Sequence, residues 1–388
     1  MGKIIATDKQ FVANTYNRFN VELVKANGSI LRDSQGKKYI DMGSGIGVTA
    51  FGHNDKGWNK AVKRQLNKVA HTSNLYYTEP CSLLAQKLCK KTGMKKVFFS
   101  NSGAEANECA IKLARQYGIN KKGAEYTTII TLKNSFHGRT ITTLSATGQD
   151  VFHSKFMPLT NGFVYAEANN LESVKALLMT NKVCGIMLEC VQGEGGVIAL
   201  DSEFIKGVYE LAQKEDLIFI VDEVQTGNGR TGKLFSYMHY GVIPDVVSTA
   251  KGLGGGLPIG ACLMGEKVEN VFGFGDHGST FGGNPVCCAG AISIIDRLTD
   301  DFLLEVEKKS EYVFETLSKA KGVVSVTGKG LMVGIKTNRE SKDVVSECID
   351  KGVLCLTAKD KVRLLPPLNI SFKTLQKAIS ILIDVINK

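Results

Sequence analysis

The chain has 388 residues, of which 43% are hydrophobic and 22% are charged, and its formal net charge is +10. This length and composition are typical of a folded protein with a large core, arranged as two domains or as one domain with a smaller one beside it. The lysines and arginines are scattered, without basic runs or interleaved aromatic residues, so we expect small anionic molecules and not nucleic acid as partners. No apolar run has the length that crosses a membrane, and we expect no membrane association.

Ten cysteines are spread along the chain, and none of them forms a C-x-x-C motif. Three of them, Cys184, Cys190 and Cys262, lie inside apolar runs. This pattern predicts buried reduced thiols, without a disulfide framework or a metal site. The first residues have neither the apolar segment of a signal peptide nor a myristoylation pattern, so a cytoplasmic protein is expected.

The N-terminal part predicts a short β-meander followed by a change of domain. Its three strand candidates span 22–25, 30–32 and 38–40, and turn signals such as Asn27-Gly28 separate them. The glycine-rich segment 43–47 then indicates a passage between domains. Residues 58–69 place apolar side chains on one face and predict an amphipathic helix.

The central part alternates short apolar runs with helical patterns, which indicates an α/β fold with a mostly parallel, seven-stranded, doubly wound sheet. The seven strand candidates are 97–99, 127–131, 163–165, 184–188, 217–221, 246–248 and 260–264. After Pro285 the helix and strand patterns predict a smaller α+β domain. We therefore expect a large domain over 46–284, and a small domain built from 1–45 together with 285–388.

Two of these strand candidates end in residues that suit a particular cofactor. The run 217–221 ends in Asp222, at the carboxyl end of a strand, where open α/β sheets bind ligands. The run 246–248 leads to Lys251, and glycines follow it at 252 and 254–256. A lysine for an imine and an acid as charge partner are what pyridoxal 5'-phosphate (PLP) needs, and glycines permit its close approach.

Other strand ends carry weaker signals. Ser102 and Glu105 form a capping box at the start of a helix, which indicates either an anion site or a plain capped helix. Phe136 and Arg139 follow the strand 127–131, where an aromatic ring stacks on a flat cofactor and an arginine binds a carboxylate, or where both belong to a solvated loop. Glu189, after the strand 184–188, is equally typical of a helix cap.

Two glycine-rich segments imitate nucleotide-binding motifs. Residues 227–233 match G-x-x-x-x-G-K and keep an NTPase open as the alternative class, but Leu234 stands where that motif needs a serine or threonine for magnesium. The loop also follows the acidic strand, whereas in NTPases it follows a separate earlier strand. Residues 273–278 match the dinucleotide fingerprint without a strand before them. We interpret both as chance matches.

Taken in order, the motifs of this chain resemble those of the class III (ornithine-type) aminotransferases of PLP fold type I. The segments that carry the resemblance are NSGAEAN at 101–107, FHGRT at 136–140, DEVQTGNGRTG at 222–232, AKGLGGGLPIGA at 250–261 and STFGGNP at 279–285. The resemblance extends from Tyr16 to Pro367. Departures from the family pattern are Cys190, in place of a proline, and residues 54–57.

The resemblance implies a homodimer that binds PLP at active sites shared between two subunits. The residues it assigns to the cofactor are Ser102, Gly103, Ala104, Phe136, Asp222, Gln225, Lys251 and Thr280. Lys251 is expected to carry the Schiff base and Asp222 to pair with the pyridinium nitrogen. The first three residues are expected to hold the phosphate, joined by Thr280 from the second subunit.

The resemblance also implies a transaminase whose substrates are an amino donor and 2-oxoglutarate. It assigns substrate carboxylates to Arg139 and Arg363, with Ser279 also at the substrate. Glu194, grouped with Lys251 and Asp222 as catalytic, is expected to cover Arg363 in one half-reaction and to move away in the other. We expect its neighbours Gly193, Gly195 and Gly196 to let this loop move.

The choice of donor rests on few residues. Ile46 and the segment 73–76 favour the branch that acts on the δ-amine of N2-acetylornithine in arginine biosynthesis, yielding N-acetylglutamate 5-semialdehyde and glutamate. Succinylornithine, ornithine and 4-aminobutyrate remain open as donors. A PLP aminomutase, which needs no second keto acid, is a further alternative.

Overall fold

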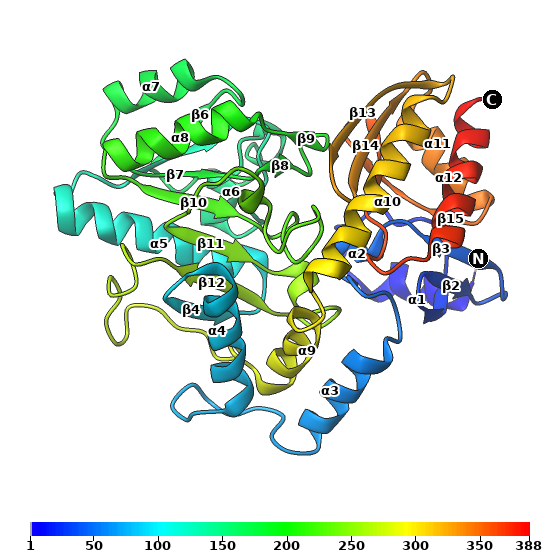
Figure 1. Ribbon diagram of the computed structural model, residues 1–388, viewed down its shortest axis with the longest axis horizontal. Helices are drawn as coiled ribbons and strands as arrows, with labels where there is room; N and C mark the ends of the chain where they lie inside the picture. The colour runs from blue at the N-terminus through cyan, green and yellow to red at the C-terminus, as the bar shows by residue number, and fades with distance from the viewer. Residues whose placement is uncertain (1) are drawn as a thin grey trace.

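The computed structural model describes residues 2–388, which form a larger and a smaller lobe (Figure 1). The larger lobe is built on a seven-stranded sheet in the order β4, β12, β11, β10, β7, β5, β6. Its strands are β4 (Lys96–Ser100), β5 (Thr128–Leu132), β6 (Phe163–Ala166), β7 (Val183–Leu188), β10 (Ile218–Asp222), β11 (Val246–Thr249) and β12 (Gly260–Met264). Only β12 runs against the other six. The predicted α/β fold with a mostly parallel seven-stranded sheet is therefore confirmed.

Helices cover both faces of this sheet. They are α4 (Glu79–Thr92), α5 (Gly103–Lys122), α7 (Leu171–Thr180), α8 (Ser202–Lys214) and α9 (Pro285–Ile295), and α3 (Lys56–Leu66) packs against α9. Along β10 successive side chains point to opposite faces. Ile218 and Ile220 pack with the α5 residues, whereas Phe219 and Val221 pack with α7 and α8. Since all of β10 is buried, its sequence is continuously apolar, as expected for a central parallel strand.

The smaller lobe combines the two ends of the chain. A mixed sheet joins β1 (Leu23–Asn27), β2 (Ile30–Asp33) and β3 (Lys38–Asp41) to β15 (Val353–Leu354), which pairs with β3 in parallel. A second sheet has the order β13 (Val323–Lys329), β14 (Met332–Thr337), β17 (Lys361–Leu364), β16 (Leu356–Ala358). The helices α10 (Asp300–Ser318), α11 (Ser341–Asp350) and α12 (Phe372–Ile386) pack on these sheets. The domain boundaries at 45/46 and 284/285 stay a prediction.

Short elements complete the chain. They are the helices α1 (Lys3–Phe11), α2 (Ser44–Gly47) and α6 (Ile141–Ala146), the 3₁₀ turns η1 (Asp150–Phe152), η2 (Ser236–His239) and η3 (Lys251–Leu253), and the two-stranded ribbon of β8 (Val191–Gln192) and β9 (Ile198–Ala199). Within the described part of the chain, no helix combines the length and the apolar character that spanning a membrane requires. The same residues contain no group of three or more His, Cys, Asp or Glu side chains placed to hold a metal ion.

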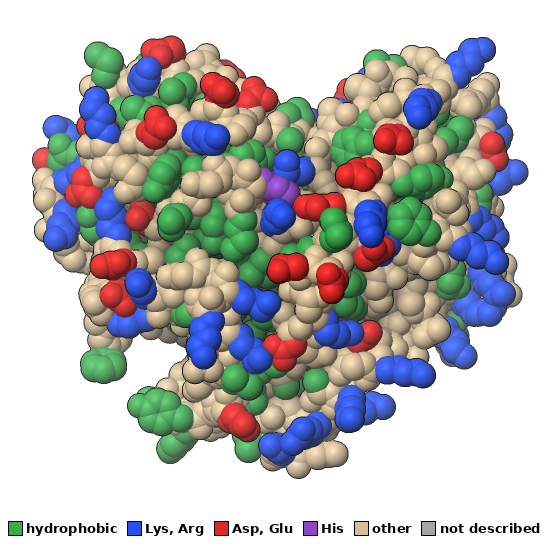
Figure 2. All heavy atoms as spheres, in the orientation of Figure 1, with side chains coloured by type: hydrophobic (Ala, Val, Ile, Leu, Met, Phe, Trp, Pro, Cys, Tyr) green, Lys and Arg blue, Asp and Glu red, His purple; other side chains and the backbone are tan. Residues whose placement is uncertain are grey.

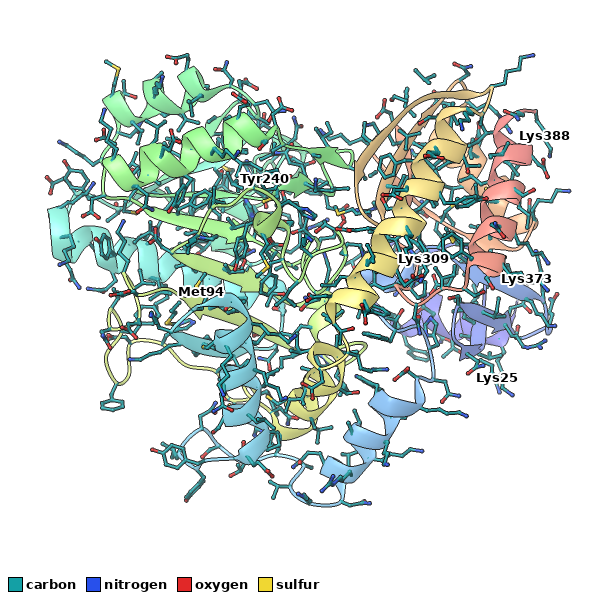
Figure 3. All side chains as sticks on the ribbon, in the orientation of Figure 1. Lys25, Met94, Tyr240, Lys309, Lys373 and Lys388 are labelled. Carbon is teal, nitrogen blue, oxygen red and sulfur yellow. The ribbon has the colours of Figure 1, made fainter. Side chains whose placement is uncertain are left out.

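A buried arginine ties the two lobes together, and a buried lysine adds a contact within the C-terminal segment. Arg230 Nη1 donates to the carbonyls of Leu331, at 3.0 Å, and Pro366, at 2.7 Å. Lys309 of α10, labelled in Figure 3, donates from Nζ to the carbonyl of Leu368 at 2.8 Å. Burial lowers the pKa of Arg230 to about 9.

The burial of the segment 227–233 argues against the NTPase alternative. The segment 227–233 is buried up to Gly232 at this junction, so it has no exposed loop that cradles a phosphate. The segment 273–278 lies in a loop that neither follows a strand nor opens a helix. Both observations support the interpretation of these motifs as chance matches. Figure 2 shows the notch that separates the upper parts of the two lobes.

Candidate active site

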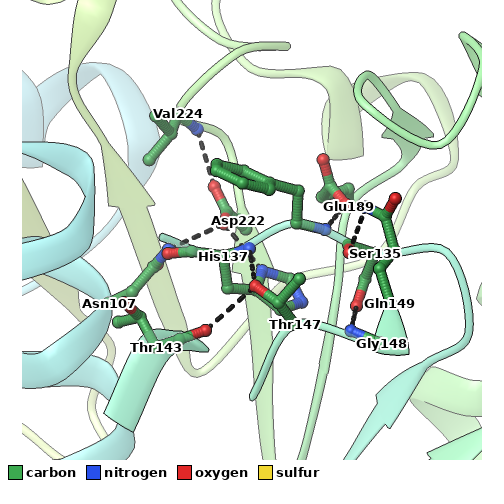
Figure 4. Close-up of polar contacts among 11 residues, drawn as sticks. Asn107, Ser135, His137, Thr143, Thr147, Gly148, Gln149, Glu189, Asp222 and Val224 are labelled. Carbon is green, nitrogen blue, oxygen red and sulfur yellow. Dashed lines mark hydrogen bonds and ion pairs between the residues drawn. The ribbon is translucent and has the colours of Figure 1, made fainter. Parts of the chain in front are cut away.

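The centre of the candidate site is Asp222, the last residue of β10. By the alternation of the strand it shares the α5 side with Ile218 and Ile220. Its Oδ2 accepts from Asn107 Nδ2 of α5 at 2.8 Å and lies 2.8 Å from His137 Nδ1, while Oδ1 accepts from the Val224 amide at 2.9 Å (Figure 4). The carboxylate is 3% exposed and fixed by three neighbours.

His137 and Asn107 are bound to Asp222 on one side and unsatisfied on the other. Burial acts to lower the pKa of His137, but the hydrogen bond and the charge of Asp222 outweigh it and raise that pKa. Within residues 2–388, His137 Nε2 and Asn107 Oδ1 are buried without a hydrogen-bond partner. Buried polar atoms normally have hydrogen-bond partners. Two buried polar atoms without a partner, next to the Asp222 carboxylate, therefore indicate a functional site.

Glu189 binds the backbone of Phe136, the residue that precedes His137. Its Oε2 accepts from the Phe136 amide at 2.9 Å, and the side chain is 5% exposed. Burial raises the pKa of Glu189 to about 7, against the lowering effect of His137 and together with the raising effect of Asp222. Glu189 is thus an acid of the site and not a helix cap.

Lys251 begins η3, directly after the end of β11. Its backbone φ is 42°, a left-handed conformation that is uncommon for a lysine. Burial lowers the pKa of its amine, and the charges of Glu194 and Asp222 offset part of this effect. The structure therefore brings Lys251 into the same electrostatic environment as the predicted acids.

The N-terminus of α5 closes one side of the site. Ser102 is the N-cap, and its Oγ accepts from the Glu105 amide at 3.2 Å. A Cβ on Gly103 would stand 2.6 Å from Val224 Cγ1, and one on Gly138 would stand 2.8 Å from Ala104 Cβ. Glycine is required here because side chains pack closely against the backbone around the helix terminus, where free amides attract an anion.

Glu194 and Arg363 meet across the two lobes. Glu194 Oε1 lies 2.5 Å from Arg363 Nη1, which also donates to Gln225 Oε1 at 3.3 Å. Arg363 is 3% exposed, and its Nε has no partner within the described residues. Burial acts to raise the pKa of Glu194, but the charge of Arg363 outweighs it and lowers that pKa, which favours the carboxylate form of Glu194.

Three predicted site residues lie apart from this cluster. Arg139 is exposed and covers the rings of Phe152 and Phe136, at 4.3 and 5.4 Å from their centroids. Ser279 Oγ accepts from Asn101 Nδ2 at 3.2 Å. Thr280 is exposed in the same loop, beside a cavity of about 530 Å³. The described chain does not test whether Thr280 serves a second subunit.

The sequence interpretation missed three residues of the site. Asn107 and His137 lie inside the quoted motifs but received no role, and Glu189 was considered only as a cap. Their contacts join positions 115, 85 and 53 residues apart, which no local pattern reveals. A signal was present for Asn107, since a polar residue on a buried helix face needs a partner.

The residues present fit PLP. A buried carboxylate with three neighbours suits a protonated ring nitrogen, and Lys251 has the lowered pKa that an amine forming an imine needs. The helix terminus at Ser102 suits the phosphate. The buried atoms His137 Nε2 and Asn107 Oδ1, which have no partner within the described residues, are consistent with a site that binds a ligand.

Fold and site together define a PLP-dependent transaminase. The family model Aminotransferase class-III matches residues 11–386, and the chain belongs to this family. A curated relative, the acetylornithine aminotransferase of Haemophilus ducreyi, is 48% identical over 98% of both chains. The succinylornithine transaminase of Yersinia enterocolitica is 41% identical over 93% of this chain and 91% of its own.

Solved structures agree with this assignment. The N-acetylornithine aminotransferase of Stenotrophomonas maltophilia is 32% identical, with a TM-score of 0.86 and 98% of each chain covered. An ornithine aminotransferase of Toxoplasma gondii, solved with partial occupancy of PLP, is 28% identical with a TM-score of 0.94, over 99% of this chain and 94% of its own. The predicted family, fold and cofactor are confirmed.

Proposed function

We propose that this enzyme transfers the δ-amine of N2-acetylornithine to 2-oxoglutarate in arginine biosynthesis, giving N-acetylglutamate 5-semialdehyde and glutamate. The observation that carries the proposal is the buried Arg363, neutralised by Glu194 at 2.5 Å. A single pocket that admits both an ω-amine and an α-keto acid needs an arginine that is covered for the first and free for the second. The names of the curated relatives support this choice of donor.

The cofactor, when bound, supplies an electron sink that makes the proton on the reacting carbon acidic. Asp222 would oppose the positive charge of the ring nitrogen, and two such charges about 4 Å apart attract by about 4 kcal/mol at an intermediate dielectric. His137 and Asn107 keep this carboxylate in place. Phe136 would stack on the ring and Gln225 would reach its hydroxyl side.

Lys251 would hold the cofactor and then act as the base. Burial lowers the pKa of its amine, so a larger fraction of Nζ is neutral than in an exposed lysine and is available as a base. The same Nζ would return the proton to a different carbon, which would complete the shift. Ser102, Gly103 and Ala104 would hold the phosphate meanwhile.

Arg139 and Arg363 would bind substrate carboxylates in different half-reactions. Arg139, exposed at the aromatic pair, would bind the α-carboxylate of the donor, and Ser279 would also contact the substrate. Arg363 would bind the carboxylate next to the keto group of 2-oxoglutarate once Glu194 has turned away. A bidentate contact of this kind needs the planar guanidinium.

The test is a panel of steady-state rates with N2-acetylornithine, N2-succinylornithine, ornithine and 4-aminobutyrate, each with and without 2-oxoglutarate. The proposal expects the highest kcat/KM for N2-acetylornithine and strict dependence on the keto acid. A higher value for another amine would reassign the donor. Product formation without keto acid would instead indicate an aminomutase.

The same proposal includes a cytoplasmic homodimer with shared sites. Ten free cysteines are compatible with a reducing compartment. Leu75, Tyr76 and Tyr77 are 87%, 71% and 101% exposed, and Phe281, in the loop of Thr280, is 59% exposed. Large apolar side chains gathered on a surface are typical of an interface, so a second subunit is expected to cover them.

A further inference from the structure

Glu194 lies in the tight turn of the β8–β9 ribbon. Val191 pairs with Ala199 and Gln192 with Ile198, so residues 193–197 form the connection. Val197, the last of them, is fully buried and has a φ of 54°. A β-branched residue is rarely left-handed, so packing around Val197 must hold it in this conformation.

Val197 is seated on two glycines of the smaller lobe. A Cβ on Gly334 of β14 would stand 2.7 Å from Val197 Cβ, and one on Gly328 of β13 would stand 3.0 Å from Val197 Cγ1. The valine therefore occupies the space in which side chains at these two positions would stand. Met332 and Leu365 belong to the same buried cluster. We call Gly328 and Gly334 the valine seat.

The valine seat adjoins Arg363. Gly334 is the cross-strand partner of Arg363 in the β14–β17 pair. Partners in an antiparallel pair project toward the same face of the sheet, so Val197 packs on the face from which Arg363 extends. Glu194 stands three residues before Val197 and thereby reaches Arg363.

The backbone of this turn is packed and not free to swing. A Cβ on Gly193 would stand 2.4 Å from Gln225 Oε1, and one on Gly195 would stand 2.5 Å from the Asn134 carbonyl oxygen. These two glycines permit close approach, which favours a fixed backbone over the loop movement expected from the sequence. The side chain of Glu194, at 29% exposed, has room to rotate.

We propose that Val197 is a positioning residue: its seat on Gly328 and Gly334 fixes the turn so that Glu194 covers Arg363. Arg363 is then released by rotation of the Glu194 side chain while the backbone stays in place. This inference rests on the proposed function, because only an enzyme with two unlike substrates needs Arg363 in two states. How well Val197 fills the valine seat would set the balance between Arg363 covered by Glu194 and Arg363 free.

The experiment fills the valine seat from the opposite side. In Gly334→Ala the new methyl group displaces Val197 and, with it, Glu194. Unreactive glutarate, which must displace Glu194 to reach Arg363, should then bind the holoenzyme about tenfold more tightly, as expected for one weakened charged hydrogen bond. Calorimetry measures this affinity. The single-turnover rate with glutamate, relative to that with N2-acetylornithine, should rise by a similar factor.

Two further variants separate positioning from general damage. Gly322→Ala is the matched control, since its methyl group would stand 2.7 Å from Ile386 Cγ2, away from the turn. The double change Gly334→Ala with Val197→Ala should shift both quantities no further than Gly334→Ala alone, because the two changes break the same contact. If Gly334→Ala does not fold, Val197→Ala should shift both quantities in the same direction by about threefold.

The proposal is overturned if Gly334→Ala, or Val197→Ala in its place, behaves like Gly322→Ala in both measurements. It is also overturned if the effects of the two single changes simply add in the double variant. Failure of the proposed function is distinguishable, because it would appear in the wild-type enzyme as a lack of amine transfer from N2-acetylornithine to 2-oxoglutarate.

Discussion

The two halves of the active site are built in opposite ways. Around Asp222 every contact comes from the larger lobe, and three neighbours fix the carboxylate at the end of a central strand. Around Arg363 the contacts cross from one lobe to the other and depend on one ion pair with Glu194. The first half is preorganised for a cofactor that stays, whereas the second can exchange one partner for another.

The half of the site around Asp222, which we call the fixed half, should lose the most activity when Lys251 is changed. Lys251→Ala removes both the amine that would hold the cofactor and the base that moves the proton, so turnover should fall by several orders of magnitude. Thermal unfolding should show a folded protein. Lys233→Ala, at an exposed lysine paired with Glu307, is the control. Near-wild-type turnover of Lys251→Ala would exclude it from the chemistry.

Asp222→Asn keeps the shape of the fixed half and removes its charge. We expect a drop of several orders in kcat and a smaller change in KM, because the ring nitrogen loses its charge partner. Asp216→Asn, at a surface acid bonded to Tyr117 and Lys267, should leave kcat unchanged. A loss of less than about tenfold for Asp222→Asn, roughly 1.4 kcal/mol, would make Asp222 a structural residue.

Thr280→Val tests whether a second subunit completes the fixed half. We expect weaker PLP retention, and a further loss on dilution, measured by absorbance of the bound cofactor. Mixing Lys251→Ala chains with Thr280→Val chains should restore activity, since one site per heterodimer then combines an intact lysine with an intact threonine. If mixing restores nothing, each site lies within one chain.

The smallest expected effect concerns Glu189, whose pKa is raised to about 7 in the folded protein. The folded state then holds a proton that the unfolded chain releases near pH 4.5, so ionisation destabilises the fold progressively between about pH 4.5 and 7. The melting temperature of Glu189→Gln should therefore rise above that of the wild type as the pH increases through this interval. The difference should reach a few degrees above pH 7. Thermal unfolding of the cofactor-free protein measures it. A difference independent of pH would contradict the raised pKa.

The sequence was sufficient where the signal is local. The strand 217–221 is continuously apolar because β10 is buried on both faces, and its end delivers Asp222 as predicted. The N-terminal meander and the helices after Pro285 were recognisable for the same reason, since their periodicity reflects burial on one face. The strands β8, β15 and β16 escaped prediction because two or three residues carry no period.

The site could be predicted only as far as its motifs reach. Glu194 and Arg363 are 169 residues apart, and their pairing depends on the packing of two lobes. For Gly193 and Gly195 we expected loop movement, but a glycine in a sequence does not reveal whether its missing side chain leaves freedom or admits a neighbour. Only the distances to Gln225 and Asn134 decide between these two uses.

The contrast between a fixed and an exchanging half is tested most directly by single-turnover rates of cofactor conversion, measured separately with N2-acetylornithine and with glutamate. In Glu194→Ala, Arg363 is left free, so the rate with glutamate should rise relative to that with N2-acetylornithine. Arg363→Lys should do the reverse, because lysine lacks the bidentate contact. Equal losses with both amines in both variants would contradict the exchange and leave Arg363 as a structural residue.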